Sequence, residues 1–393
     1  MSKLDVLCNQ FNKQYKEDIA SKGIPVRHFK KIPLSSPLAN YMLYGGLPRN
    51  RIIEFAGEEN GGKTTTALDA VANAQKLFTQ EYADELEELN SLMNDGKIGK
   101  ERQARLKYLN ERGPKKVIYC DCENTLDDEW SRKLGVDVDN MILLKPMSQT
   151  AEQIFEMLLQ MIETDEVGLV VIDSLGVMIS QQAYEKDMEQ KTYGGISAPL
   201  TLFSKKAELL CTKYDCTLIG INQMRDDMNS MYGGQTTTGG KGWKHNCSLR
   251  LMFKKGDYID ENNNSMRRSC DNPSGNLISI AIAKTKVCNP DRRNGYYTLN
   301  YNNGVDIISD TIELAIKYGI IQKAGSWFTI IDIETGEIMQ TEIYISTDEQ
   351  NNPVFEKEDL KFQGKPSVIE YLKNNDDIFD LIYGQVMEKL ERQ

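Results

Sequence analysis

The sequence predicts an α/β protein with a mainly parallel central sheet covered by helices. Three observations support this fold class. Residues Gly57–Thr64 match the spacing of a phosphate-binding loop and lie between a strand candidate and a helix candidate. Short apolar runs alternate with helical stretches from about residue 50 to residue 250. Strand-like segments follow residue 249 and are expected to extend the sheet at an antiparallel edge.

The composition is ordinary for a soluble globular protein, and 393 residues suffice for about two or three domains. The chain has no apolar run of about 18 residues and no signal-peptide pattern at its start, so we expect a cytoplasmic protein without a membrane partner. Eight scattered cysteines and two histidines show no zinc spacing, which favours free thiols. A net charge of −11 argues against coating of nucleic acid by bulk basicity, but it is compatible with a local basic groove.

The N-terminal segment carries apolar side chains at Leu4, Leu7, Phe11 and Tyr15. Spacings of three and four residues place these side chains on one face of a helix, which Gly23–Pro25 is expected to end. One helix cannot bury an apolar face by itself. It must therefore pack on the same chain or on a neighbouring copy.

Four apolar runs predict the buried strands of the core. Each run is apolar at consecutive positions, as expected for a strand with helices on both faces. After the first run and the phosphate-binding loop, a helix is expected to begin, with its positive N-terminal end facing the anion. The four runs are Ile52–Ala56, Val117–Cys120, Gly168–Asp173 and Thr217–Asn222.

A charged segment at about residues 80–113 separates the first helix from the second strand. Its first half is acidic and its second half is basic, on either side of Asn94–Gly96. This pattern predicts two helices whose opposite charges face each other. We interpret the segment as a solvated surface insertion, because charge runs usually serve solubility.

The last part of the chain predicts further strands and a small α+β domain that begins near Gly304. Ser309 or Asp310 is expected to cap a helix that ends at Gly319. The remaining expected elements are strands at Leu249–Phe253, Leu277–Ala283, Gly295–Tyr301 and Trp327–Ile330, a loop at about 348–353, and helices within 366–390.

The phosphate-binding loop supplies the first chemical groups. Its glycines let consecutive backbone N–H groups point at phosphates, while Lys63 reaches the β and γ oxygens and the Thr64 hydroxyl ligates Mg²⁺. The residues expected to contact the nucleotide here are Gly57, Glu58, Glu59, Asn60, Gly61, Gly62, Lys63, Thr64 and Thr65.

Polar residues at the ends of the other predicted strands extend this site. Asp173 is placed to act on Mg²⁺ through water, although a strand-end turn residue is the alternative. Glu123 follows the second strand and is placed to orient and deprotonate a water molecule that attacks the γ-phosphate. Gln223 is suited to sense that phosphate, because its amide both donates and accepts hydrogen bonds.

Taken together, these motifs resemble those of the RecA-family recombinases. The resemblance covers nearly the whole chain apart from the insertion at 80–113 and part of the last domain, and the divergence between motifs is similar to that of phage-encoded members. The matching stretches, in the family's order, are Gly57–Thr65, Arg132–Asn140, Val171–Leu175, Ile221–Arg225, Thr236–Gly240 and Lys323–Trp327.

The resemblance implies an ATP- and Mg²⁺-dependent recombinase that forms a helical filament on single-stranded DNA. It also implies strand exchange with homologous duplex DNA, ATP hydrolysis stimulated by single-stranded DNA, and a single-stranded-DNA-binding protein and a loading mediator as further partners. By the same resemblance, residues 1–34 are an oligomerisation helix and linker, 35–303 the ATPase core, and 304–393 a C-terminal domain.

The resemblance also implies roles for individual residues. Glu123 matches the catalytic glutamate, Asp173 the metal carboxylate, and Gln223 the glutamine that couples the state of ATP to DNA binding. Asp127 matches a residue that contacts adenine, and Trp130 an aromatic residue that stacks on it, although a core tryptophan is the alternative.

Lys284 and Lys286 match a pair of lysines that reaches the γ-phosphate of the neighbouring subunit, which would stabilise charge in phosphoryl transfer. Exposed lysines at a strand end are the alternative. The residues alone leave two other functions possible, a ring helicase and a non-motor recombination mediator. A ring helicase is expected to have an arginine finger in place of this lysine pair, and intact Glu123, Lys63 and Thr64 count against a non-motor recombination mediator.

Two segments, 181–198 and 224–241, resemble the family's DNA-binding loops. Glycines and hydroxyl groups approach a sugar-phosphate backbone closely without reading sequence. Pro199, in place of a basic residue, and Asp226–Asp227, inside the second loop, depart from the family's pattern and are expected to alter DNA affinity. The residues expected to contact DNA are Gly194, Gly195, Ile196, Ser197, Lys206, Met224, Arg225, Thr237, Thr238, Gly239, Gly240 and Lys241.

Overall fold

The computed structural model describes residues 2–15, 20, 29–96, 99–186, 195–227, 234–261, 263–266, 271–347 and 353–392. It divides into two compact units, residues 1–30 and 31–393. In the first unit, helix α1 (Lys3–Tyr15) forms as predicted, and the side chains of its apolar face are exposed. The predicted end of this helix at Gly23–Pro25 lies outside the described residues.

The second unit is built on one large sheet, which confirms the predicted α/β class. Strands β9, β3, β7, β6, β4 and β5 run parallel, and β11, β12 and β13 continue the sheet antiparallel beyond β9. The prediction that β9 begins the antiparallel extension was therefore wrong, since β9 pairs parallel with β3. The bounds are β3 (Ile52–Gly57), β4 (Lys116–Asp121), β5 (Ile142–Leu144), β6 (Val167–Asp173), β7 (Thr217–Asp227), β9 (Leu249–Ile259), β11 (Gly275–Thr285), β12 (Asn294–Asn300) and β13 (Gly304–Val305).

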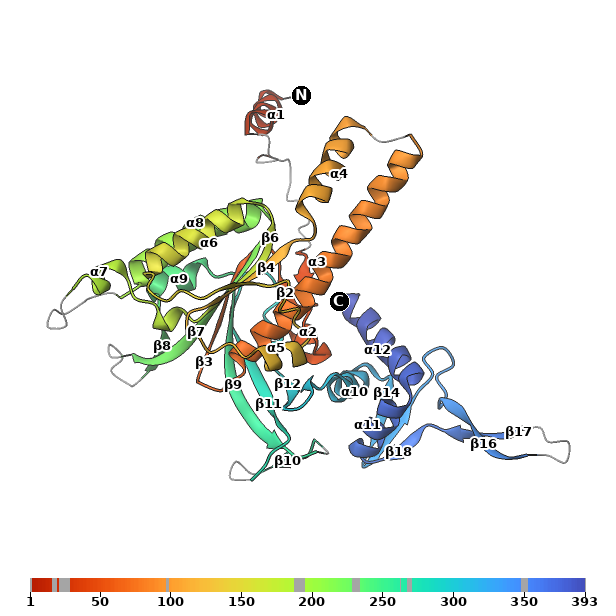
Figure 1. Ribbon diagram of the computed structural model, residues 1–393. Coiled ribbons are helices and arrows are strands. Elements are labelled where there is room, and N and C mark those ends of the chain that lie inside the picture. The colour runs from red at the N-terminus through yellow and green to blue at the C-terminus, as the bar shows by residue number, and fades with distance from the viewer. Residues whose placement is uncertain are drawn as a thin grey trace. The chain divides into compact units, whose positions relative to one another are not determined.

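Helices cover both faces of this sheet (Figure 1). Helices α2 (Pro37–Met42) and α3 (Lys63–Asn94) contribute to the apolar core on one face. Helices α6 (Ala151–Glu163), α8 (Ser197–Lys213) and α9 (Gly240–Asn246) contribute to the core on the other face. The two cores explain why the central strands are apolar at consecutive positions.

The charged insertion forms a helical hairpin, as predicted, but its acidic half is not a separate helix. Helix α3 runs without interruption from the phosphate-binding loop to Asn94, and α4 (Lys100–Arg112) returns beside it (Figure 1). The hairpin has its own small core, and Arg105 donates two hydrogen bonds to Glu85 at 2.7 and 2.9 Å. The core residues are Tyr82, Leu86, Leu89, Leu106 and Leu109.

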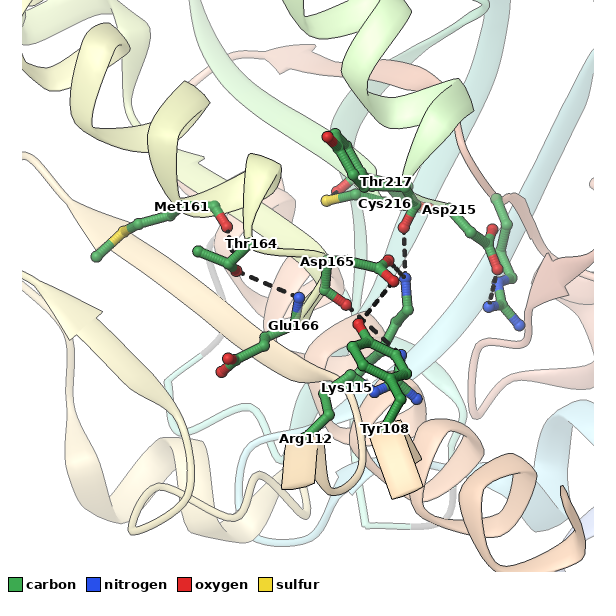
Figure 2. Close-up of polar contacts among 12 residues, drawn as sticks. Tyr108, Arg112, Lys115, Met161, Thr164, Asp165, Glu166, Asp215, Cys216 and Thr217 are labelled. Atoms are coloured by element: carbon green, nitrogen blue, oxygen red, sulfur yellow. Dashed lines mark hydrogen bonds and ion pairs between the residues drawn. The ribbon is translucent and has the colours of Figure 1, made fainter. Parts of the chain in front are cut away.

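The base of α4 is fixed to the sheet through Asp165, which precedes β6 (Figure 2). The Asp165 carboxylate accepts a hydrogen bond from the Tyr108 hydroxyl at 2.8 Å and pairs with the Lys115 ammonium group at 3.2 Å. Lys115 also donates to the carbonyl of Tyr214, three residues before β7 begins at Thr217. The hairpin is therefore anchored at the starts of β4, β6 and β7, which is the edge opposite the phosphate-binding loop.

The C-terminal part combines helices with small sheets. Helix α10 (Ile307–Tyr318) ends at Gly319 as predicted, but its N-cap is Asp306, whose carboxylate accepts from the Ser309 N–H at 3.0 Å, rather than Ser309 or Asp310. The hairpin of β16 and β17 was not predicted (Figure 1). The remaining elements are β14 (Ile321–Ala324), β15 (Trp327–Ile330), β16 (Gln340–Thr347), β17 (Pro353–Asp359), β18 (Lys361–Gln363), α11 (Lys365–Asn374) and α12 (Asp376–Glu391).

Asp310 joins this part to the core. Its buried carboxylate accepts from the Ser36 hydroxyl at 2.6 Å, at the N-terminus of α2, and from the Thr298 N–H of β12 at 3.1 Å. Burial raises the pKa of Asp310 to about 7. Within the described ranges, no helix is both long and apolar enough to span a bilayer.

Candidate nucleotide and DNA site

The phosphate-binding loop connects β3 to α3. Gly62 precedes the first turn of α3 with a φ of 91°, and a Cβ atom there would lie 2.5 Å from the Ile278 side chain. Both the backbone conformation and the close packing require glycine at this position. Helix α3 consequently begins at Lys63, with its first N–H groups directed into the loop.

Lys63 is held inside the loop. Its ammonium group donates to the carbonyl of Gly57 at 3.0 Å and to that of Glu58 at 2.5 Å, and the residue is 7 % exposed. Burial lowers the pKa of Lys63, while the carboxylates of Asp173 and Glu123 oppose this shift. The cation is thus placed where phosphate oxygens would replace backbone carbonyls as its partners.

Asp173 ends β6 beside the loop. Its Oδ2 atom accepts from the Thr64 hydroxyl at 2.8 Å and from the Tyr119 hydroxyl at 2.7 Å. Burial raises the pKa of Asp173, and these two hydrogen bonds oppose the increase. A hydroxyl and a carboxylate in contact are hard oxygen donors, so Thr64 and Asp173 fit the preferences of Mg²⁺. Sequence reasoning missed Tyr119, because its role depends on the pairing of β4 with β6.

Glu123 and Gln223 are in contact. Glu123 Oε1 accepts from the Ser174 hydroxyl at 2.5 Å and from Gln223 Nε2 at 3.3 Å. Glu123 follows β4, Ser174 follows β6, and Gln223 lies on β7. Parallel strands end at the same edge of a sheet, so their register brings together residues that are far apart in sequence. Ser174 was not predicted as part of the site.

A cavity of about 400 Å³ adjoins the phosphate-binding loop and has the size of a small-molecule site. Trp130 lines it and also packs against the main core, so stacking on adenine stays a prediction. Asp127 is not among the lining residues. Its carboxylate caps α5 (Asp128–Lys133) by accepting from the Trp130 N–H at 2.9 Å. An adenine contact by Asp127 therefore remains a prediction.

Strands β9 and β11 and the residue that follows β12 contribute side chains to this cavity that sequence reasoning missed. Tyr301 donates to Asn276 Oδ1 at 2.7 Å, and Lys255 donates to the Tyr258 hydroxyl at 2.9 Å. Lys255, Asn276 and Tyr301 all line the cavity. The only sequence signal was the alternation of the strands, which does not indicate that their ends lie beside the phosphate-binding loop.

The first DNA segment is described only in part. Helix α7 (Gln181–Tyr184) opens it, and Gly194 lies outside the described residues. Gly195 and Ser197 flank Ile196, which is 3 % exposed and belongs to the core beneath α8. Lys206 lies on the exposed side of α8, 3.9 Å from Glu156. Ile196 therefore serves packing in this structure, and DNA contacts by this segment remain predictions.

The second DNA segment is not simply a loop. Strand β7 continues through Met224 and Arg225 to Asp227 and pairs antiparallel with β8 (Gly234–Thr237), while residues 228–233 lie outside the described ranges. Arg225 donates to the carbonyl of Gly176 at 2.8 Å. After β8, Thr238 and Gly239 lead into α9, which contains Gly240 and Lys241. The described part of the segment thus begins as a two-stranded ribbon of β7 and β8, and β7 is also the strand that carries Gln223.

Lys284 and Lys286 contact the end of α9 within the same chain. Lys284 donates to the carbonyls of Lys244 and His245 at 2.7 and 2.6 Å, and Lys286 to that of His245 at 3.0 Å. Burial and the charge of Lys286 lower the pKa of Lys284. Cations at the C-terminal end of a helix are stabilising, so this arrangement gives the pair a structural role. A reach to a neighbouring subunit remains a prediction.

Comparison with known proteins gives a consistent result. The family model described as "RecA N-terminal domain" matches residues 15–85 and 104–306, so the unmatched gap falls on the distal part of the α3–α4 hairpin. Protein RecA of Streptomyces venezuelae is 28% identical over 347 residues, which cover 88% of this chain and 72% of that protein. Protein RecA of Clostridioides difficile is 30% identical over 294 residues, covering 75% and 71%.

Proposed function

Because the chain belongs to the RecA family of ATP-dependent recombinases, we propose that it hydrolyses ATP while assembled on single-stranded DNA and pairs that DNA with a homologous duplex. The observation that carries this proposal is the convergence of five side chains at one edge of the sheet. Lys63, Thr64, Asp173, Glu123 and Gln223 come from four elements and meet beside the nucleotide cavity.

Each of these groups suits one part of phosphoryl transfer. Lys63 and the N–H groups of the loop bind the β- and γ-phosphates. Thr64 and Asp173 would hold Mg²⁺, which supplies positive charge beside the phosphates when bound. Glu123 accepts a proton from the attacking water molecule.

Gln223 is placed to report the presence of the γ-phosphate. Its amide donates to Glu123 in this structure, and a phosphate oxygen offers a stronger, charged acceptor. Since Gln223 precedes Met224 and Arg225 on the same strand, a change of its partner moves the start of the second DNA segment. Through this connection, the presence or absence of the γ-phosphate changes the affinity of the second DNA segment for DNA.

Lys284 and Lys286 complete the site from a neighbouring subunit in the proposed filament. Head-to-tail association that does not close produces a helical filament, and it places one subunit's strand end against the next subunit's nucleotide. We propose that the pair leaves the carbonyls of α9 for the neighbour's γ-phosphate when the filament forms. Hydrolysis then requires assembly.

The test is the rate of ATP turnover with and without single-stranded DNA. We expect DNA to stimulate the wild-type protein. Glu123→Gln should lower the turnover number by about 10²–10⁴-fold with little change in nucleotide affinity, because only the proton acceptor is lost. Lys284→Ala with Lys286→Ala should abolish stimulation in a subunit that still folds. Absence of stimulation in the wild type would contradict the proposal, and directional unwinding of a forked duplex would favour a ring helicase.

A further inference from the structure

Glu54 is a buried carboxylate on the strand of the phosphate-binding loop, and the reaction described above does not use it. It lies in the middle of β3 and is 0 % exposed. Its Oε1 atom accepts from Asn222 Nδ2 at 2.9 Å and from the Trp243 indole N–H at 3.0 Å, and its Oε2 atom pairs with the Arg250 guanidinium. A buried charge is costly unless donors surround it, so this position is a built polar cluster.

The three donors come from elements that border the second DNA segment. Asn222 lies on β7 directly before Gln223, Trp243 lies on α9 directly after the segment, and Arg250 lies on β9. The backbone makes space for this arrangement, because a Cβ atom at Gly220 would lie 2.7 Å from the Trp243 ring. The carboxylate is therefore the common acceptor for β7, α9 and β9.

Two of these donors also hold the DNA segment itself. Asn222 Nδ2 donates to the carbonyl of Thr238 at 2.8 Å, and an Arg250 nitrogen donates to the Thr237 hydroxyl at 3.4 Å. Glu54 thus fixes the amide and the guanidinium that in turn fix Thr237 and Thr238. A continuous set of contacts runs from β3 to residues that we expect to touch DNA.

The same cluster contains two buried oxygen atoms without a hydrogen-bond partner among the described residues. They are Asn222 Oδ1 and Thr238 Oγ1, which belong to two residues already in contact. Buried polar atoms are seldom left unpaired. A shift of the segment that let the Thr238 hydroxyl donate to Asn222 Oδ1 would satisfy both atoms.

We infer that Glu54 is a positioning residue that ties the strand of the phosphate-binding loop to Thr237 and Thr238 and thereby couples nucleotide binding to DNA binding. The inference rests on the proposed function, since it takes residues 224–241 to contact DNA. Glu54 itself touches neither ligand. Its effect is exerted through Asn222 and Arg250.

The test is Glu54→Gln in the full-length protein. Glutamine keeps the shape, but its NH₂ group replaces one acceptor oxygen and cannot accept the hydrogen bond or bonds made there, and the charge of Arg250 is left unpaired. We expect affinity for a fluorescent oligonucleotide, with a non-hydrolysable ATP analogue, and stimulation of turnover by DNA each to fall about tenfold or more. Nucleotide affinity and turnover without DNA should stay within about twofold, because the nucleotide cavity is lined by other residues.

Arg250→Lys is the second variant and covers the case in which Glu54→Gln fails to fold. Lysine keeps a positive charge beside Glu54 but lacks a second nitrogen for Thr237. We expect a loss of DNA affinity and stimulation in the same direction, about threefold or more, with nucleotide affinity retained.

Asp69→Asn is the matched control. Asp69 is 3 % exposed, lies on α3, and accepts from the Ser35 N–H at 3.0 Å and from Asn73 at 3.1 Å, neither of which belongs to the DNA segment. It should lower thermal stability and keep DNA stimulation. Wild-type stimulation in either test variant, or an equal loss in Asp69→Asn, overturns the inference. If DNA does not stimulate ATP turnover in the wild-type protein, the proposed function and the inference both fail. If DNA stimulates the wild type and also both test variants to the same extent, only the inference fails.

Discussion

At the scale of single residues, the charge of Asp173 depends on two hydroxyl donors. Thr64 and Tyr119 both donate to its Oδ2 atom, and they oppose the effect of burial on its pKa. With Mg²⁺ bound, the Thr64 hydroxyl would ligate the metal, and the Tyr119 hydroxyl would remain as a donor to the carboxylate. Tyr119 is 1 % exposed, so its hydroxyl donates to Asp173 from the interior of the protein.

We predict that Tyr119→Phe moves the acid limb of ATP turnover to higher pH. Loss of a donor to a charged group removes stabilisation of the ionised form, so the pKa of Asp173 rises further. Since binding of Mg²⁺ requires the ionised carboxylate, activity is lost at a higher pH than in the wild type. The measurement is turnover against pH at several Mg²⁺ concentrations.

Tyr297→Phe is the control for this prediction, because the Tyr297 hydroxyl pairs with the Thr66 hydroxyl at 2.8 Å rather than with Asp173. It should leave the acid limb in place. Coincident pH profiles for Tyr119→Phe and the wild type would contradict the assigned role of Tyr119.

Each site residue that was predicted from the sequence belongs to a motif or follows the end of a predicted strand. Lys63 and Thr64 are fixed by the loop pattern, and Asp173 follows an apolar run. Tyr119 and Glu54 carry no such mark. Tyr119 reads as one more apolar position within a strand, and its partner is defined only by the register Tyr119↔Val171, which places its hydroxyl beside Asp173.

At the scale of elements, the tip of the α3–α4 hairpin lies far from the phosphate-binding loop. At about 1.5 Å per residue, the 32-residue helix α3 carries the tip of the hairpin roughly 45 Å from Lys63. Its small core is distinct from the two that cover the sheet. The family model also leaves residues 86–103 unmatched.

We predict that Leu109→Ala loosens the hairpin and leaves ATP turnover within about twofold of the wild type. Leu109 is 0 % exposed, and removal of a buried leucine side chain costs about 2–5 kcal/mol. Limited proteolysis should show faster cleavage between α3 and α4, and amide hydrogen exchange should rise in α4. Leu209→Ala, at a leucine that is 74% exposed on α8, should change neither. A parallel loss of turnover would show that the hairpin acts on the site.

The ends of strands were predicted less well where hydrogen bonding to a neighbouring strand determines them and the apolar pattern of the sequence does not. The sequence after Asn222 is polar, so the predicted strand ended there, but pairing with β8 extends β7 to Asp227. The β16–β17 hairpin was likewise missed. Its cross-strand pair Tyr344 and Phe355, at 6.2 Å between ring centroids, is visible only once the register is known.

At the scale of the whole molecule, one buried carboxylate joins the core to the C-terminal part. Asp310 of α10 accepts from Ser36, which lies 274 residues earlier in the chain, and from Thr298 of β12. Its pKa of about 7 lies above the ordinary value of 3.8. Between these two values, the folded protein keeps a proton that the unfolded chain has released. Stability must therefore fall as the pH rises through this interval.

We predict that this fall amounts to as much as about 1.4 kcal/mol per pH unit between pH 4 and pH 7, and that it levels off above pH 7. Asp310→Asn removes the titrating group and should flatten the dependence, since an amide stays neutral throughout. The measurement is the free energy of unfolding by denaturant at pH 5, 6, 7 and 8 for both proteins. Asp377→Asn, at an exposed carboxylate of α12, should keep the wild-type slope. Equal slopes for Asp310→Asn and the wild type would show that Asp310 is ionised in the folded protein across this range and that the link between core and C-terminal part is a charged one.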